Sequence, residues 1–308
     1  GYSFRNSLFA HNVKYKKIGS IAPVITNLVL NTSFTKSVMG IAQERSVPKL
    51  ANTTFSNWFA KEHIIKKSKK VYLFNDEFTN FYDVEIGKDA VFVLEKLGYE
   101  VIVLKHEESG RSFISKGFLK EAKKVCDKNI ALFKDIISDE TPLIGIEPSA
   151  ILTFRDEYIR LATDKIAAEK IAKNALTFEE FLSNEHQKNN VDISLFSSEG
   201  KEIKIHGHCH QKALSSTHAS FQILNIPKNY KVTILNTGCC GMAGSFGYEK
   251  EHYEISMQVG EDTLFPKIRN CAPETEIAAS GTSCRHQIYD GTKRIAKHPI
   301  TLLKEALI

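Results

Sequence analysis

Four of the six cysteines are spaced as the ligands of a metal centre would be: Cys209, Cys239, Cys240 and Cys284. Neighbouring residues such as Cys239 and Cys240 rarely reach ordinary disulfide geometry with each other. Clustered cysteines in a chain of this size indicate metal binding or catalysis more than a disulfide framework. Thiolates suit zinc or an iron–sulfur centre and select against magnesium and calcium. We therefore predict that these four cysteines hold one metal centre, with thiols that merely fill a core as the alternative.

The other two cysteines have simpler interpretations. Cys126 follows helical spacing with Ala122 and Ile130, which is typical of a thiol in a hydrophobic core. Cys271 is two residues before Pro273 in an expected loop, and we assign it no role.

Polar and glycine-rich residues surround the four cysteines. His206, His208 and His210 are themselves candidate ligands, but a histidine beside a cysteine ligand more often donates an N–H to sulfur. We expect this supporting role for four residues that stand next to the ligands in the sequence: His208, His210, His286 and Arg285. Arg285 could equally be a surface residue. The amides of the loop Gly238–Gly247 can donate to sulfur. The alternative for this loop, a nucleotide cradle, is disfavoured because its spacing is not GxGxxG.

Alternating strands and helices must position these residues. Apolar runs predict strands at 71–74, 101–104, 143–146, 203–206, 232–235 and 277–279, and helices at 87–97, 116–133, 211–224, 251–264 and 299–307. This order predicts an α/β fold with parallel sheets. The loops after the carboxyl ends of parallel strands meet at one edge, so the cysteines should converge there from three loops.

The two halves of the chain form an internal repeat. The positions that carry cysteines in the second half are occupied in the first half by other residues: Glu77, Glu108, Ser109 and Ala150. Oxygen ligands suit an iron–sulfur cluster poorly, so we expect the first half to bind no metal and to act as a scaffold and docking face. We expect Glu77 and Glu108 to be an exposed, solvated pair, with a divalent-ion site as the alternative.

The pattern predicts two similar Rossmann-like α/β subdomains and an N-terminal helical arm. The predicted divisions are the arm at 1–69, a first repeat without cysteine ligands at 70–184, a linker at 185–200 and a second repeat with the metal site at 201–308. Within the arm we expect a short helix over Ser37–Gln43. The arm has little core of its own, so we expect it to dock on the following domain or on one that precedes it.

Composition excludes several classes of protein. The chain has 308 residues, with 42% hydrophobic and 25% charged residues, which is the balance of a folded domain. The net charge of +5 fits a lysine-rich solvated surface, with an acidic partner or a membrane surface as alternatives. We expect no nucleic-acid partner. The sequence contains no run of about 18 apolar residues, so we predict no membrane span. The chain begins at Gly1 and has no signal-peptide pattern, so we expect a fragment of a cytoplasmic protein, with the inner face of the membrane as an alternative location.

Three motifs resemble the cysteine-rich CCG domain: His206–Ala213, Gly238–Gly247 and Gly281–Gln287. This domain occurs in glycolate oxidase iron–sulfur subunits, lactate-utilisation iron–sulfur proteins and heterodisulfide reductases. The chain most resembles the C-terminal region of large FAD-linked oxidases. Further matching segments are Pro48–Phe55, Phe74–Thr79, Gly110–Arg111, Ile146–Ser149 and Phe154–Glu157, so the resemblance covers nearly the whole chain.

The resemblance implies the iron–sulfur electron-transfer part of a flavin-linked 2-hydroxyacid dehydrogenase of the D-lactate or glycolate type. A 4Fe–4S cluster is the implied cofactor, with zinc as the alternative. FAD would reside on a missing domain. The implied partners are a flavin domain and a ferredoxin-type domain, in the same or a partner chain, and a homo-oligomer is compatible with the sequence. The family's terminal CxxC is absent here, which favours one ordinary cluster over a centre that needs five thiolates.

Such a fragment is expected to be inactive alone, because the hydride chemistry belongs to the flavin domain. Two other functions remain open at this point. One is a docking module with a structural zinc ion. The other is an enzyme like heterodisulfide reductase that acts on a thiol or disulfide.

Overall fold

The computed structural model describes residues 2–62 and 66–308, and contains two four-stranded parallel sheets. The first sheet consists of β1 (Lys69–Phe74), β2 (Tyr99–Ile102), β3 (Leu143–Gly145) and β4 (Ala175–Thr177), in the order β2-β1-β3-β4. The second consists of β5 (Lys201–His206), β6 (Tyr230–Ile234), β7 (Glu276–Ala279) and β8 (Ala296–Lys297), in the order β6-β5-β7-β8. The identical order confirms the predicted internal repeat and the α/β class.

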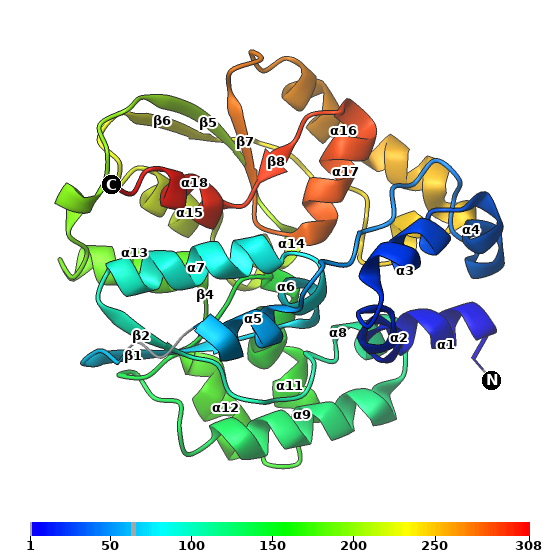
Figure 1. Ribbon diagram of the computed structural model, residues 1–308, viewed down its shortest axis with the longest axis horizontal. Helices are drawn as coiled ribbons and strands as arrows, with labels where there is room; N and C mark the ends of the chain where they lie inside the picture. The colour runs from blue at the N-terminus through cyan, green and yellow to red at the C-terminus, as the bar shows by residue number, and fades with distance from the viewer. Residues whose placement is uncertain (1, 63–65) are drawn as a thin grey trace.

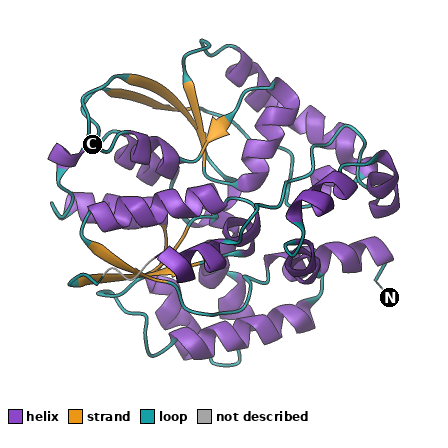
Figure 2. Ribbon diagram, viewed as in Figure 1, coloured by secondary structure: helices purple, strands orange, loops and turns teal. Residues whose placement is uncertain are grey.

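Helices cover both sheets (Figures 1 and 2). Those of the first unit are α6 (Glu77–Phe81), α7 (Val84–Lys96), α8 (Arg111–Ser115), α9 (Leu119–Phe133), α10 (Pro148–Ile151), α11 (Glu157–Leu161), α12 (Lys165–Asn174) and α13 (Phe178–Gln187). Those of the second are α14 (Cys209–Leu214), α15 (Thr217–Leu224), α16 (Tyr253–Arg269), α17 (Thr282–Thr292) and α18 (Pro299–Glu305). In Figure 1, α7 and α13 lie between the two sheets.

The two units share one hydrophobic core. Val71 and Leu73 of β1 belong to the same buried cluster as Ile203 and Ile205 of β5. Helix α18 supplies Leu302 to this cluster and packs on α7. The predicted linker is also anchored, because α13 extends to Gln187 and the side chains of Val191 and Phe196 are buried. The repeats are therefore held in a fixed relation, which allows residues of one to contact the site of the other.

The N-terminal region is helical, as predicted. Its helices are α1 (Phe4–Ala10), α2 (Asn12–Gly19), α3 (Pro23–Leu30), α4 (Ser33–Met39) and α5 (Phe55–Glu62). Residues 1 and 63–65, which the predicted arm includes, lie outside the described part of the chain. The helix expected over Ser37–Gln43 is misplaced. It starts at Ser33 because Thr32 accepts a hydrogen bond from the amide of Thr35, and it ends where Gly40 takes a left-handed conformation with φ 66°.

Further predictions differ from the structure. The helix expected over Lys116–Phe133 begins only at Leu119, because Gly117 takes a left-handed conformation with φ 78°. The helix expected over Gln211–Leu224 is two helices, because the side chain of Ser216 caps α15 and breaks the first helix before it. Helix α16 continues past the expected end at Leu264 and includes Pro266. The strands β4 and β8 were not predicted, since runs of three and two residues have no clear period. None of the described helices has the length and apolar character that crossing a bilayer requires.

Candidate metal centre

The four predicted cysteines lie at the carboxyl edge of the second sheet. Cys209 begins α14, three residues after β5 ends at His206. Cys239 and Cys240 are in the loop after β6, and Cys284 is in the first turn of α17, after β7. The parallel strands thus deliver sulfur atoms from three loops to one place, as the topology requires.

The sulfur atoms form a continuous series in which each contacts the next. The Sγ atoms of Cys240 and Cys284 are 3.6 Å apart. Cys239 hydrogen-bonds to both Cys209 and Cys240. Cys240 and Cys284 are only 3% and 1% exposed, whereas Cys209 and Cys239 are partly exposed. The group therefore has a dry side against the core and an accessible side at the surface.

The contacts between the sulfurs lower the pKa of some of the four thiols and raise the pKa of others. Hydrogen bonds from Cys209 and Cys240 lower the pKa of Cys239, and a hydrogen bond from Cys240 together with the charge of His208 lowers the pKa of Cys284. The same hydrogen bonds raise the pKa of Cys209 and, with burial, that of Cys240. Cys239 and Cys284 are thus the more acidic thiols of the group, and thiolate is the form that binds metals.

The glycine-rich loop allows the backbone to approach the sulfurs closely. The amide of Gly241 donates to Cys239 Sγ at 3.3 Å. Gly241 has φ 91°, and a Cβ atom there would be 2.2 Å from the carbonyl oxygen of Ser256. Only glycine fits both restrictions. The loop therefore serves as a sulfur-binding turn in this fold.

His206 groups with two of the four sulfurs. One of its ring nitrogens lies within 4.8 Å of both Cys240 Sγ and Cys284 Sγ. Its Nδ1 is 2.8 Å from Thr237 Oγ1, and its buried Nε2 has no hydrogen-bond partner among the described residues. A buried ring nitrogen without a partner is costly unless a ligand satisfies it. The sequence motif includes His206, but nothing in the sequence distinguishes its role from those of His208 and His210.

His208 and His210 face the first repeat instead. His208 Nε2 is 3.9 Å from Glu147 Oε1, and His210 Nε2 is 3.2 Å from the guanidinium of Arg111. Glu147 also accepts a hydrogen bond from the amide of Thr282 at 2.8 Å. Burial opposes ionisation of Glu147, but these partners outweigh it and lower the pKa of its carboxyl. Glu147 thus ties the first repeat to the turn that contains Cys284.

Arg285 is a structural link and not a free surface residue. Its guanidinium donates to Asp83 Oδ2 at 2.6 Å and to the carbonyl oxygens of Ala279 and Ser280 at 3.0 and 2.6 Å. His286 is half-buried, and burial lowers its pKa. The predicted roles of His208, His210, Arg285 and His286 toward the metal remain predictions.

Arg45 also supports the site, although no sequence pattern around it indicates this. Its side chain is fully buried and donates to the carbonyl oxygen of Gly247 at 2.6 Å and to Ser256 Oγ at 2.8 Å. It also hydrogen-bonds to Gln287 and forms an ion pair of 3.3 Å with Asp290. One residue of the arm therefore joins the cysteine loop to α16 and α17.

The corresponding place in the first repeat is closed by hydrogen bonds. Ser109 donates to Glu77 from its amide at 2.9 Å and from its hydroxyl at 2.7 Å, and Ala150 is buried in the core. The expectation of an exposed pair is wrong, because Glu77 is buried and Glu108 is half-buried. Burial and the neighbouring Glu77 raise the pKa of Glu108 to about 8.

Lys16 from α2 places a buried ammonium beside these carboxylates, over the rings of Phe78 and Tyr82 at 5.0 and 4.4 Å. Burial lowers its pKa to about 8. The arm thus supplies a positive charge in the first repeat at the place equivalent to the sulfurs of the second.

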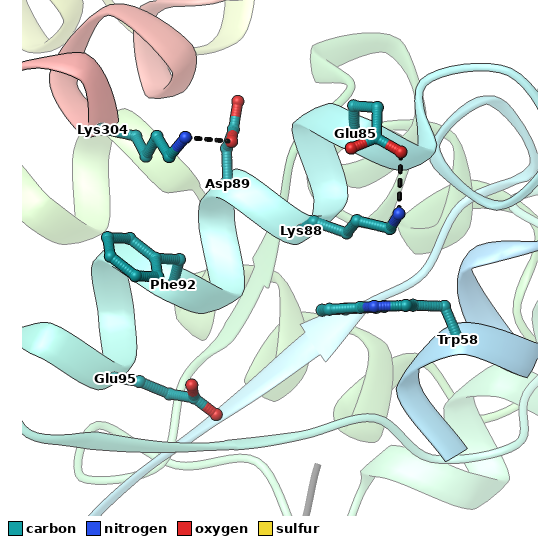
Figure 3. A pocket seen from close by; sticks show the side chains of 7 residues that line it. All are labelled: Trp58, Glu85, Lys88, Asp89, Phe92, Glu95 and Lys304. Atoms are coloured by element: carbon teal, nitrogen blue, oxygen red, sulfur yellow. Dashed lines mark hydrogen bonds and ion pairs between the residues drawn. The ribbon is translucent and has the colours of Figure 1, made fainter. Parts of the chain in front are cut away.

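A shallow pocket elsewhere is not part of this site. It has a volume of about 240 Å³, and Figure 3 shows its lining residues on α5, α7 and α18. Lys88 and Lys304 pair there with Glu85 and Asp89, and none of the cysteines contributes to it.

The donor set fits a soft metal centre. It combines four contiguous sulfurs, a backbone amide already directed at one of them and an unsatisfied imidazole nitrogen. Sulfur and imidazole suit iron–sulfur clusters and zinc, and no carboxylate among the described residues joins this group.

Comparison with known proteins finds relatives that are named as dehydrogenases or as parts of them. It is 26% identical to the D-2-hydroxyglutarate dehydrogenase of Pantoea ananatis over 95% of this chain. It is also 26% identical to one subunit of the anaerobic glycerol-3-phosphate dehydrogenase of Escherichia coli, over 99% of this chain and 78% of that protein. Lactate utilization protein A of Bacillus licheniformis matches over 67% of this chain at 26% identity. These matches confirm the resemblance to the CCG-type iron–sulfur oxidoreductases.

The chain spans only 29% of the length of the Pantoea dehydrogenase. No family model matches it. A solved structure of a hypothetical protein from Helicobacter pylori aligns with 91% of this chain and 56% of that one, at 13% identity and a TM-score of 0.45.

Proposed function

We propose that this chain is the iron–sulfur electron-transfer part of a flavin-linked 2-hydroxyacid dehydrogenase. The observation that supports it most is the convergence of four cysteine sulfurs in the fold of a chain related to such dehydrogenases. The ligands would be Cys209, Cys239, Cys240 and Cys284. A 4Fe–4S cluster bound by them would accept and release single electrons.

The residues around the sulfurs have distinct tasks in this proposal. The amide of Gly241 and the ring of His206 stabilise negative charge on sulfur. Buried Cys240 and Cys284 keep water from one side, while partly exposed Cys209 and Cys239 form the side where a redox partner can approach. Glu147 and Arg285 fix the turn of Cys284 against the first repeat. None of these residues would contact the hydroxy acid.

The partners in this proposal are a flavin domain, which would take the hydride, and a ferredoxin-type domain. The related dehydrogenase is more than three times as long as the matched segment, and another relative is named a subunit, so further domains or chains have room to supply these parts. We place the protein in the cytoplasm, because free thiols persist in a reducing compartment.

A structural zinc site is the second candidate. The grouping of His206 with Cys240 and Cys284 favours it, since zinc accepts mixed cysteine and histidine ligands. Zinc would leave the protein colourless and without labile sulfide, so metal analysis distinguishes the two functions.

The functional test uses the anaerobically purified chain and its visible absorption. We expect dithionite to bleach the absorption and an artificial dye to restore it. D-lactate, glycolate and D-2-hydroxyglutarate should cause no bleaching, even with added FAD, because hydride transfer needs the flavin domain. Bleaching by one of these acids with the chain alone would contradict the division of labour proposed here.

A further inference from the structure

Helices α3 and α4 turn polar side chains toward the protein and apolar side chains toward the outside. The polar residues of α3 point toward the protein: Thr26 Oγ1 donates to the carbonyl oxygen of Gly19 at 3.0 Å, and Asn27 exchanges two hydrogen bonds with the backbone of Leu50, at 2.9 and 2.8 Å. In α4 the inward residue is Lys36, which is buried and donates to the carbonyl oxygen of Arg45 at 2.8 Å. A surface helix of a globular protein normally buries its apolar side.

The apolar side chains of this region point outward. We call them the arm face: Ile18, Ile21, Val24, Ile25, Leu28, Val29, Phe34 and Val38. All are exposed, Ile21 at 84% and Phe34 at 79%, and α3 has no buried residue at all. More than half of the exposed large hydrophobic side chains in the described part of the chain lie between Tyr2 and Val38. Such a concentration marks an interaction surface.

The charge of the same segment favours an anionic surface. The first acidic residue of the chain is Glu44, and before it stand five basic residues: Arg5, Lys14, Lys16, Lys17 and Lys36. This segment accounts for the whole net charge of +5, because acidic and basic residues balance in the remainder. Only two of these five charges are free to meet such a surface, those of Lys14 and Lys17, which are exposed next to Ile18. Lys16 and Lys36 are buried, and Arg5 is paired with Glu249 and Glu251.

The chemistry of the arm face suits lipid better than protein. The four outward residues of α3 are aliphatic and have no hydrogen-bonding group, whereas protein interfaces form about one hydrogen bond per 100–200 Å². Exposed aliphatic side chains can enter the headgroup region of a bilayer without spanning it, and lysines beside them add attraction to anionic lipids. Helix α3 itself has no charged residue, so Lys14 and Lys17 of α2 would supply that attraction. In Figure 1, α3 and α4 lie on the right-hand side of the molecule, with α4 at its edge, opposite the C-terminus.

We propose that the arm face binds the surface of an anionic lipid membrane, with Lys14 and Lys17 at the headgroups. The protein body would then rest on the bilayer through the polar inner side of α3. The amide of Ala42 donates to the carbonyl oxygen of Tyr248 at 2.9 Å, so the unit that contains the cysteines is held to the same arm. The proposal does not depend on which metal the cysteines hold.

The experiment is flotation of the purified chain with vesicles. One set contains phosphatidylcholine alone, and the other equimolar phosphatidylcholine and phosphatidylglycerol. We expect the chain to float with the anionic vesicles, and binding to weaken as salt is raised because exposed charges are screened. Ile25→Gln with Leu28→Gln should reduce partitioning about tenfold or more, since two apolar side chains lose their transfer to lipid. Lys14→Gln and Lys17→Gln should each reduce it about fivefold on anionic vesicles only.

The matched control is Ile166→Gln with Ile295→Gln, which removes two equally exposed apolar side chains outside the arm. All four positions are exposed, so folding should persist, and a melting curve for each variant verifies this. Equal flotation of the arm and control variants would overturn the proposal. So would folded wild-type chain that floats with neither vesicle, which would assign the arm face to a protein partner or to a second copy of the chain.

Discussion

His206 allows the metal centre to be tested without removal of a sulfur. Its Nε2 lacks a partner among the described residues, while Thr237 holds Nδ1. Supporting groups of this kind commonly contribute ten- to a hundredfold to metal affinity. We therefore expect His206→Gln to release iron to a chelator about tenfold faster or more than wild type, with a changed visible spectrum.

The control for this variant is His218→Gln, which changes an exposed histidine of the same unit. Equal rates of iron release from His206→Gln and wild type would show that the imidazole does not act on the centre.

Glu179 gives a prediction for the dependence of stability on pH. Its side chain is fully buried, and one carboxylate oxygen accepts a hydrogen bond from Ser280 while the other has no partner in the described part of the chain. His298 Nε2 is 4.0 Å away. Burial raises the pKa of Glu179 to about 7, against an ordinary value of 4.5. The unfolded chain loses this proton more readily, so stability should decrease as the pH rises from about 4.5 through about 7.

Glu179→Gln should remove this dependence. We expect its melting temperature to exceed that of wild type above about pH 8 by an amount that reflects up to about 3 kcal/mol, and the difference to shrink toward about pH 5. Glu199→Gln, at an exposed position, is the control. A constant difference between the two melting curves at all pH values would contradict the assignment.

At the scale of elements, Arg45 connects the arm to the metal-bearing unit. Its buried guanidinium has partners in the cysteine loop, α16 and α17. Loss of one partner of a buried ion pair costs about 3–5 kcal/mol, because the other charge stays buried. We expect Arg45→Met to lower the free energy of unfolding by that amount in a denaturant titration, and to reduce retained iron.

Arg269→Met serves as the control, since Arg269 forms an exposed pair with Glu261. Exposed pairs contribute at most about 1 kcal/mol. If Arg45→Met and Arg269→Met lowered stability equally, the arm would not be the support described here.

The strands and the convergence of cysteines could be predicted, but several contacts could not. Apolar runs such as Val71–Phe74 and Ile203–His206 identify strands, and the positions of the cysteines after them identify the edge. The role of Arg45 depends on contacts with residues about 200 positions away, which a local pattern does not contain. The same holds for the bond between Glu147 and Thr282. His206 differs from its neighbours only by its orientation in the folded site.

At the scale of the whole molecule, two copies of one fold carry different residues at the equivalent ligand positions. The sequence repeat predicted the shared topology correctly, because motif positions recur at similar intervals. It did not predict that Glu77 bonds directly to Ser109, or that Lys16 lies among the carboxylates of the first repeat. A lysine in the arm gives no local sign of which distant carboxylates it will meet.

These differences lead to one expectation about metal binding in the first repeat. The first repeat should bind no metal, since the groups at its ligand positions are the oxygen atoms of Glu77, Glu108 and Ser109, of which Glu77 and Ser109 bond to each other, and an alanine. Glu77→Gln with Glu108→Gln should therefore leave the iron content unchanged.

The most direct measurement is the content of iron, labile sulfide and zinc in anaerobically purified protein. We predict about four iron and four sulfide per chain, without zinc, for wild type and for Cys126→Ser and Cys271→Ser. Iron and sulfide should be lost in Cys209→Ser, Cys240→Ser and Cys284→Ser. Zinc without sulfide, two clusters per chain, or full iron occupancy in Cys284→Ser would contradict the proposed centre.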